Sequence, residues 1–176
     1  AALNTAYTSN GTDQMSGLND EAVTLTDTTL AVALLNTLNG NTSGSVNAGT
    51  LTTLSGTAAD LNTAYGAAGI TGLGNEAATV SDTTLAVATL NTLDGNTIGT
   101  VNAATINTLT GAAAAANTAY ASNATAQMSG LNDEAVTLDD TTLAVATLNT
   151  LDGNTSGAIN AATINTLTGA AAAANT

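Results

Sequence analysis

The sequence predicts a repeat solenoid of the α/β class, with short strands and short helices stacked in coils of a 55–58-residue unit. The motif Asp-Thr-Thr-Leu-Ala-Val recurs once per unit, starting at Asp27, Asp82 and Asp140. The motif Asn-Thr-Ala-Tyr recurs with the same period, starting at Asn4, Asn62 and Asn117. Strand-like and helix-like patterns alternate within each unit, and such units bury a core by stacking on their neighbours.

The repeats divide residues 1–176 into one continuous array with approximate units 4–61, 62–116 and 117–174. The second and third copies are identical over 82–97 and 140–155, and again over 102–118 and 160–176. This identity leads us to expect a window of a longer chain or filament. Two units have a short insertion between the tyrosine and the following Gly-Leu, which predicts a surface loop there.

The first half of the unit is predicted to hold a strand and a helix. Residues 22–26 alternate apolar and polar, so Val23 and Leu25 are expected to face inward, as are Val136 and Leu138 in the third unit. Asp27 is the predicted helix cap and Gly40 the predicted stop. One helical face is expected to carry Leu30, Leu34 and Leu38, and Leu85 and Leu93 in the second unit.

The second half of the unit is predicted to hold a strand around Val46, Val101 and Ile159, a turn of helix, and a further helix. The turn of helix would have Asn102 as cap, Ile106 and Leu109 on one face, and Gly111 as stop. The further helix would begin with Thr57 to Asp60, which have the spacing of a capping box, and continue into Leu61 and Tyr65. Its later counterpart is the alanine run 112–116.

Two further structural expectations follow from the composition and the repeats. An all-β solenoid of the same period is the alternative, favoured by Thr, Val and Gly but disfavoured by the alanine runs. Equivalent asparagines are expected to form side-chain ladders along the axis, namely Asn36, Asn91 and Asn149.

The charge is entirely negative: the chain of 176 residues has 13 Asp and Glu, no Lys, Arg or His, and a formal charge of −13. Its mutual repulsion favours an extended shape and makes divalent cations plausible partners. Nucleic acid is excluded as a partner, because phosphate binding depends on Lys and Arg. Membrane insertion is not expected either, because no apolar run approaches the roughly 18 to 20 residues that a bilayer requires. The absence of Cys is compatible with an extracellular location.

Catalysis is not predicted, because acid–base and nucleophilic sites usually depend on His, Cys, Lys or Arg, leaving here only carboxyl, hydroxyl and amide groups. Adjacent acids occur at 20–21, 133–134 and 139–140, and they are expected to be solvated surface groups. For the first two of these pairs, calcium binding is more credible than catalysis, since carboxyl oxygens suit that ion. The candidate weak calcium ligands are Asp20, Glu21, Asp133 and Glu134.

Two other recurring motifs have structural explanations. Asp94-Gly95-Asn96 and its copy at 152–154 are expected to be turns that end helices. The three tyrosines stand at one position of the repeat and are expected to fill core space, namely Tyr7, Tyr65 and Tyr120.

Several phrases resemble the repeats of giant secreted surface, filament or adhesin-like proteins of cyanobacteria and other bacteria. They are Gly72-Leu-Gly-Asn-Glu-Ala77, Ser81-Asp-Thr-Thr-Leu-Ala86, Leu90-Asn-Thr-Leu-Asp-Gly-Asn-Thr97 and Gly56-Thr-Ala-Ala-Asp-Leu-Asn-Thr-Ala-Tyr65. The shorter Thr57-Ala-Ala-Asp-Leu-Asn62 and Leu93-Asp-Gly95 resemble Thr-Ala-Ala-Glu-Leu-Asn and Leu-Asp-Gly repeats of phage tail fibres. The resemblance implies duty as a stalk, sheath, filament or adhesin.

The leading hypothesis is therefore a non-catalytic structural component of an extracellular filament, sheath or surface layer. It would associate with identical copies or neighbouring repeats. The alternative is an adhesin stalk or spacer, which would stay monomeric and elongated. A third hypothesis is an ice-binding protein, because Thr and Ala arrays on a regular scaffold could order water.

Overall fold

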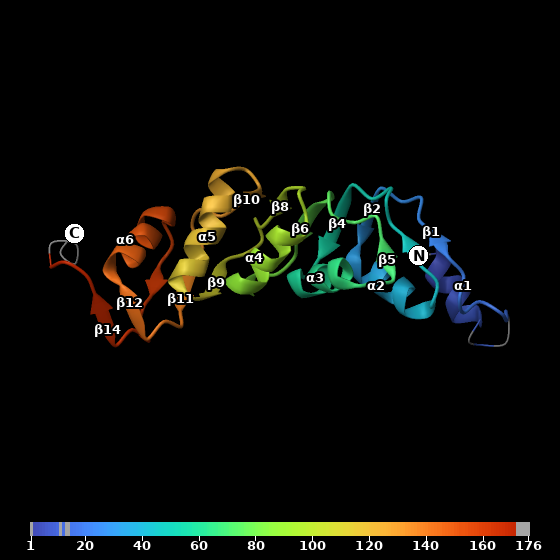
Figure 1. The fold of residues 1–176 in the computed structure, drawn as a ribbon, viewed down its shortest axis with the longest axis horizontal. Helices are drawn as coiled ribbons and strands as arrows, with labels where there is room; N and C mark the ends of the chain where they lie inside the picture. Colours follow the sequence, from blue (N-terminus) through green and yellow to red (C-terminus); the bar gives the residue numbers. More distant parts are fainter. Residues whose placement is uncertain (1, 11, 13–14, 172–176) are drawn as a thin grey trace.

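A computed structural model describes residues 2–10, 12 and 15–171, so residues 11, 13 and 14 of the first predicted unit, in its predicted surface loop, and residues 172–174 of the third lie outside it. The described chain is an elongated α/β protein whose elements follow one another along the long axis (Figure 1). Its helices are α1 (Ala2–Asn10), α2 (Val32–Asn41), α3 (Ala58–Gly66), α4 (Val87–Asn96), α5 (Ala113–Ala124) and α6 (Val145–Asn154). These helices show that the all-β alternative was wrong.

The strands are short and belong to four sheets. They are β1 (Val23–Thr24), β2 (Thr29–Ala31), β3 (Val46–Asn47), β4 (Thr53–Gly56), β5 (Ile70–Thr71), β6 (Ala77–Val80), β7 (Thr84–Ala86), β8 (Val101–Asn102), β9 (Thr108–Gly111), β10 (Met128–Ser129), β11 (Ala135–Leu138), β12 (Thr142–Ala144), β13 (Ile159–Asn160) and β14 (Thr166–Thr168). The sheet orders are β1-β3-β5, β10-β8-β6-β4-β2, β13-β11-β9-β7 and β12-β14.

Parallel pairing shows that the structural step is about half the sequence period. Val46 pairs with Val23 on one side and with Ile70 on the other, so two pairings span less than one unit. Leu109 pairs with Val136, which is again about half a unit further along the chain. Each unit therefore contains two strand–helix segments. We call α2, α4 and α6 the first-type helices and α1, α3 and α5 the second-type helices.

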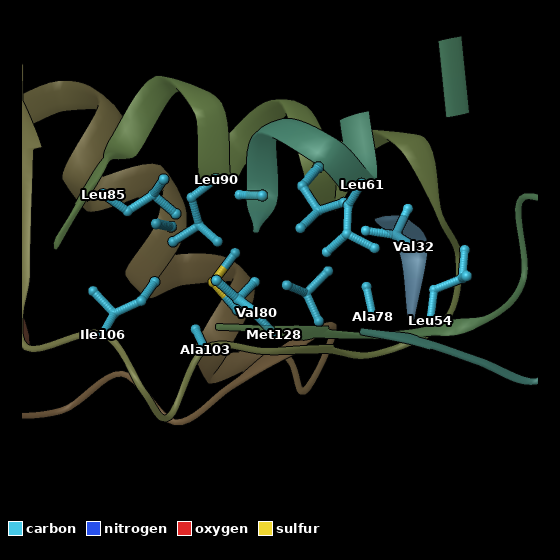
Figure 2. Packing of buried hydrophobic residues seen from close by; sticks show 14 of the residues in the cluster. Val32, Leu54, Leu61, Ala78, Val80, Leu85, Leu90, Ala103, Ile106 and Met128 are labelled. Carbon is cyan, nitrogen blue, oxygen red and sulfur yellow. The ribbon is translucent and has the colours of Figure 1, made fainter. Parts of the chain in front are cut away.

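Apolar side chains from the helices and strands form one cluster that runs through the units. In Figure 2, Leu61 of α3 and Leu90 of α4 point toward the strands that carry Ala78, Val80 and Met128. All five side chains are at most 1% exposed. The predicted inward positions are confirmed, since Val23, Leu25, Val136 and Leu138 are all buried.

The first-type helices begin later than the sequence indicated. Residues 29–31 form β2, which pairs with β4, and α2 starts at Val32 without a side-chain cap. The predicted leucine face was therefore wrong in part: Leu30 lies on a strand and Leu34 is exposed, whereas Leu38 of α2 and Leu93 of α4 are buried on their helices as predicted. The other buried positions of α2 are Val32 and Leu35. Leu85 likewise lies on β7. The β-branched Thr pair before the leucine favours this strand. The predicted end of the helix at Gly40 was nearly right, since α2 ends at Asn41, the next residue.

The predicted turn of helix after Asn102 was also wrong. Asn102 Oδ1 accepts the N–H of Ala104 in a local turn, and residues 108–111 form β9 between β7 and β11. Ile106 and Leu109 are both buried, but in a turn-and-strand arrangement instead of a helical one. Gly111 ends the strand with a φ of +132°, a conformation that glycine adopts without strain.

The alanine helix is confirmed, and the capping box is confirmed in part, because the Asp60 carboxyl group accepts the hydroxyl of Thr57 instead of its backbone N–H. Thr57 Oγ1 accepts the N–H of Asp60 at 3.1 Å at the start of α3, and α5 begins at Ala113. The insertion after Tyr120 contributes to a longer helix, because α5 has 12 residues and α3 has 9. The surface-loop prediction for this insertion was therefore wrong in part.

The recurring aspartate caps a helix of the preceding segment and not its own. Asp82 Oδ2 accepts the N–H of Ala58 at 2.8 Å, and Asp140 Oδ2 accepts the N–H of Ala113 at 2.7 Å. These N–H groups belong to the first residues of α3 and α5, which have no partner within their own helices. The motif thus fastens one segment to the one before it.

Asparagines connect every consecutive pair of helices in the described chain. In each pair the Nδ2 group of one helix donates to a backbone carbonyl of the next at 2.9 to 3.1 Å. The pairs are Asn4 to Leu34, Asn36 to Asp60, Asn62 to Thr89, Asn91 to Ala115, and Asn117 to Thr147. For Asn36 and Asn91, the expected side-chain ladder is replaced by bonds to the backbone.

A glycine after each first-type helix allows two segments to approach closely. A Cβ atom added to Gly99 would overlap the backbone carbonyl of Glu76, and the same holds for Gly44 at Glu21 and Gly157 at Glu134. By contrast, a Cβ atom at Gly95, inside α4, would meet nothing within 4 Å.

We expect Gly99→Ala and Gly95→Ala to change stability in opposite directions. The first should lower the free energy of unfolding by about 1–3 kcal/mol, because two backbones must separate. The second should raise it by about 0.5–1 kcal/mol, because alanine is the better helix former. Urea unfolding followed by circular dichroism measures both, and equal effects would contradict the close-approach argument.

Candidate functional site

The most elaborate polar arrangement is a three-residue cluster that recurs once per unit. Each cluster consists of a tyrosine from a second-type helix, a glutamate before the next strand, and a threonine that ends the following first-type helix. The clusters are Tyr7–Glu21–Thr42, Tyr65–Glu76–Thr97 and Tyr120–Glu134–Thr155.

The third cluster shows the geometry best. The Tyr120 hydroxyl donates to Oε2 of Glu134 at 3.1 Å, and the N–H of Asn132 donates to both carboxyl oxygens at 3.0 and 3.1 Å. The Thr155 hydroxyl donates to the backbone carbonyl of Glu134 at 3.0 Å and accepts the N–H of Gly157. Glu134 is only 2% exposed. The cluster therefore joins two consecutive helices through one buried acidic residue.

The second cluster has one unsatisfied atom. Tyr65 donates to Oε2 of Glu76 at 3.4 Å and the N–H of Gly74 donates to the same oxygen at 2.9 Å. The other oxygen, Oε1, is buried and has no hydrogen-bond partner. Glu76 is 0% exposed, so a solute cannot reach this carboxyl group from outside without movement of the chain.

Burial controls the ionisation of two of the tyrosines. It is the main cause that raises the pKa of Tyr65 and of Tyr120 to about 12, and the negative charge of the neighbouring Glu76 or Glu134 raises it further. Hydrogen bonds with Thr97 and Thr155 act in the opposite direction. Both phenols therefore stay neutral hydrogen-bond donors at physiological pH.

The adjacent acids do not act as pairs. Glu134 points into the core and Asp133 is exposed, while Asp140 caps α5 and Asp139 is exposed. Glu21 is partly exposed and accepts the Tyr7 hydroxyl, whereas Asp20 is exposed. The expectation of solvated surface acids was thus wrong for Glu134, which the structure buries.

The remaining motifs behave largely as expected. The motif 94–96 forms the C-terminal end of α4, and 152–154 that of α6. The tyrosines occupy core space, since Tyr7 and Tyr120 are buried and Tyr65 is partly buried against the core.

Sequence reasoning missed Glu76, Thr42, Thr97 and Thr155 as members of the clusters. The available signal was position in the repeat, because Glu76 stands at the same place in its unit as Glu21 and Glu134 do in theirs. It has no acidic neighbour, so a search for adjacent acids did not find it.

A comparison with known protein families, with curated proteins and with solved structures finds no significant match to this chain. Among the described residues, no helix has the length and apolar character needed to cross a bilayer. Within the same residues, no three or more His, Cys, Asp or Glu side chains gather where they could hold a metal ion. Calcium binding at Asp20, Glu21, Asp133 and Glu134 remains a prediction.

We expect alkali to destabilise the fold through Tyr65 and Tyr120. An unfolded tyrosine loses its proton near pH 10, whereas the pKa of Tyr65 and of Tyr120 in the folded chain is about 12, so stability should fall as pH rises from about 10 to 12. The chain has no Lys, Cys or His to titrate in this range. Melting temperatures of the double variant Tyr65→Phe/Tyr120→Phe should fall less over this range than those of the wild type. An equal fall would contradict the assignment.

We also expect a chelator to lower the melting temperature of protein prepared with calcium, because bound cations offset repulsion among thirteen negative charges. The variant Asp20→Asn/Asp133→Asn should lose part of this response, and Asp139→Asn is the matched control. An unchanged melt of the wild type would reject calcium binding.

Proposed function

We propose that this chain is a non-catalytic structural component of an extracellular filament, sheath or surface layer. Its repeats would stack as a solenoid, so that the shape of the array is the function. The observation that supports this most strongly is that each described segment is fastened to the next by the same bonds. These are parallel strand pairing, an asparagine-to-carbonyl bond between helices, and a buried apolar contact.

Repetition of one contact allows an array to lengthen without a new interface. In repeat arrays each repeat contacts mainly its neighbours, so stability and length grow with the number of repeats. Here the two longest sheets overlap in the same segments, which ties neighbouring units together. Such an array suits a mechanical role. The proposed partners are identical copies or neighbouring repeats, with divalent cations as screening ions.

The absence of reactive side chains supports a non-catalytic role. The chain has no His, Cys, Lys or Arg, and the most buried acids hold backbone N–H groups and tyrosine hydroxyls. The cell surface is the proposed location, on the resemblance of the repeats. Neither nucleic acid nor a membrane interior is among the proposed partners.

An adhesin stalk is the second candidate, favoured by the elongated outline that separates the two ends of the described chain (Figure 1). Ice binding ranks below it. Thr108 and Thr110 form a Thr-x-Thr pair on β9, but their strand neighbours include Ala135 and Ala86. The threonine array is therefore interrupted across adjacent strands.

We expect the particle to shorten by about a third when residues 62–116 are deleted, because the deletion removes one of three units and keeps the repeat in phase. Small-angle scattering measures the length, and circular dichroism checks that the fold is kept. A matched deletion of 62–103 shifts the phase and should unfold the chain. Loss of folding in the in-phase deletion would contradict the proposed array.

Electron microscopy of the concentrated wild type separates the two structural roles. Ordered fibres support a filament component, and dispersed rods support a stalk.

A further inference from the structure

The helices α2 and α4 have nearly the same sequence, so they present nearly the same surface to the segment that follows each of them. Their sequences differ at two positions only. The first is Leu34 in α2 and Thr89 in α4, whose backbone carbonyl groups each accept an asparagine of the preceding helix. The second is Asn39 in α2 and Asp94 in α4. This second position is therefore the one that can distinguish one following segment from another.

The segments that follow differ in the connection between the repeated tyrosine and the next strand. The short connection, residues 66–69, comes after the tyrosine of α3, and the long connection, residues 121–127, comes after the tyrosine of α5. Two residues after the tyrosine, the long connection has Ser122 and the short one has Ala67. The first unit also has the insertion, and it has a serine at the same position, Ser9. The serine thus accompanies the insertion.

Asp94 contacts the long connection through a short hydrogen bond. The Ser122 hydroxyl donates to Asp94 Oδ2 at 2.6 Å, the length of a charge-assisted bond. Asp94 Oδ1 is buried without a partner, so in the described chain this hydroxyl is the only hydrogen-bond donor to the carboxyl group. Gln127 of the same connection donates to the carbonyl groups of Thr97 and Gly99 at 3.2 Å each. The end of α4 is therefore fitted to the long connection.

Asn39 meets a different surface, the backbone of the short connection. A Cβ atom added to Gly69 would overlap Asn39 Oδ1, so this amide group lies directly against the glycine. Residues 66–69 are Gly-Ala-Ala-Gly and have no hydroxyl group. A carboxylate at position 39 would find no side-chain donor there, and it would add negative charge in the last turn of α2, where the helix dipole disfavours it.

We propose that residue 39 or 94 selects the connection that the next segment places against it: asparagine accepts the short connection and aspartate the long one. This inference rests on the proposed array and adds the rule by which neighbouring segments recognise each other. The apolar contact cannot supply this rule, because Val32, Leu35 and Leu38 of α2 are matched by identical residues in α4. Exchanging the two following segments would leave that contact unchanged in sum.

Similar repeats need such a rule, because arrays of them are prone to assemble in the wrong order. A short connection placed against α4 would leave Asp94 without its donor. A long connection placed against α2 would offer Ser122 to a neutral amide, and a neutral hydrogen bond is about half as strong as a charge-assisted one. Both wrong pairings are therefore disfavoured relative to the two correct ones.

One substitution in two backgrounds tests the rule. Deletion of 62–116 joins Leu61 to Asn117 and so places the long connection after α2. Asn39→Asp should lower the melting temperature of the full chain and raise that of the deletion product. Each shift should correspond to a change of about fivefold or more in the folding equilibrium constant. Shifts of the same sign and size in the two backgrounds would overturn the inference.

The matched control is Asn41→Asp, which adds the same charge to the same end of α2 at an exposed position. We expect this control to shift the melting temperature equally in the full chain and in the deletion product, because it does not depend on which connection follows. A difference between backgrounds as large as that of Asn39→Asp would assign the effect to charge alone.

A double-mutant cycle tests the same contact in the full chain, whether or not the deletion product folds. Asp94→Asn should reduce the folding equilibrium constant about fivefold or more in the wild type, and it should not reduce it in the Ser122→Ala background. Asp152→Asn is the matched control, since Asp152 is the exposed acid at the same repeat position. Additive effects of Asp94→Asn and Ser122→Ala would overturn the inference.

The failure of this rule is distinguishable from the failure of the proposed array. A deletion product that folds and is shorter, combined with additive effects at positions 94 and 122, would keep the array and reject the rule. An unfolded deletion product, combined with coupled effects at these two positions, would keep the contact and contradict the array.

Discussion

The absence of positive charge is the constraint on which the rest of the structure depends. With no Lys, Arg or His, each carboxyl group must find a neutral donor or remain in water. Backbone N–H groups supply that donor for Asp82 and Glu134, and a tyrosine hydroxyl adds a second one for Glu134. These donors belong to other segments or to nearby loops. Each hydrogen bond that stabilises a carboxyl group therefore also joins two parts of the chain.

Neutral amide and hydroxyl groups form the remaining side-chain hydrogen bonds between segments. The asparagine-to-carbonyl bonds tie each helix to the next, and threonine hydroxyls donate to backbone carbonyls earlier in the chain, as Thr97 does to Glu76, 21 residues before it. Such bonds contribute modestly when counted singly, about 0.5–1.5 kcal/mol each. Their value lies in repetition at equivalent positions, beside an apolar cluster that excludes water from them. Short helices rich in Thr and Asn, which are weak alone, are thereby stabilised by packing.

The sequence predicted the repeating unit, the α/β class, the helix cap at Thr57 and the inward positions around Val23. It did not predict that strands pair every half unit, because the two segments of a unit pair with each other although their sequences share no motif. Strand pairing with the next segment, such as that of Leu30 with Leu54, overrode the local helical spacing of the leucines that begins at Leu30. The burial of Glu76 could not be predicted from its residue type either, because only its position in the repeat distinguishes it from a surface acid.

The sheets are staggered, and this explains how the array resists separation of its units. The segment that ends in α4 contributes β5, β6 and β7 to three different sheets, and the segment that ends in α6 does the same with β10, β11 and β12. Three of the four sheets in the described chain therefore cross a unit boundary: β1-β3-β5 and β13-β11-β9-β7 each join two units, and β10-β8-β6-β4-β2 reaches from the first unit into the third. Pulling neighbouring units apart must break strands of more than one sheet at once, together with the helix contacts beside them. An array built this way resists separation along its length through the overlap of short sheets, although no single sheet in the described chain runs from one end to the other.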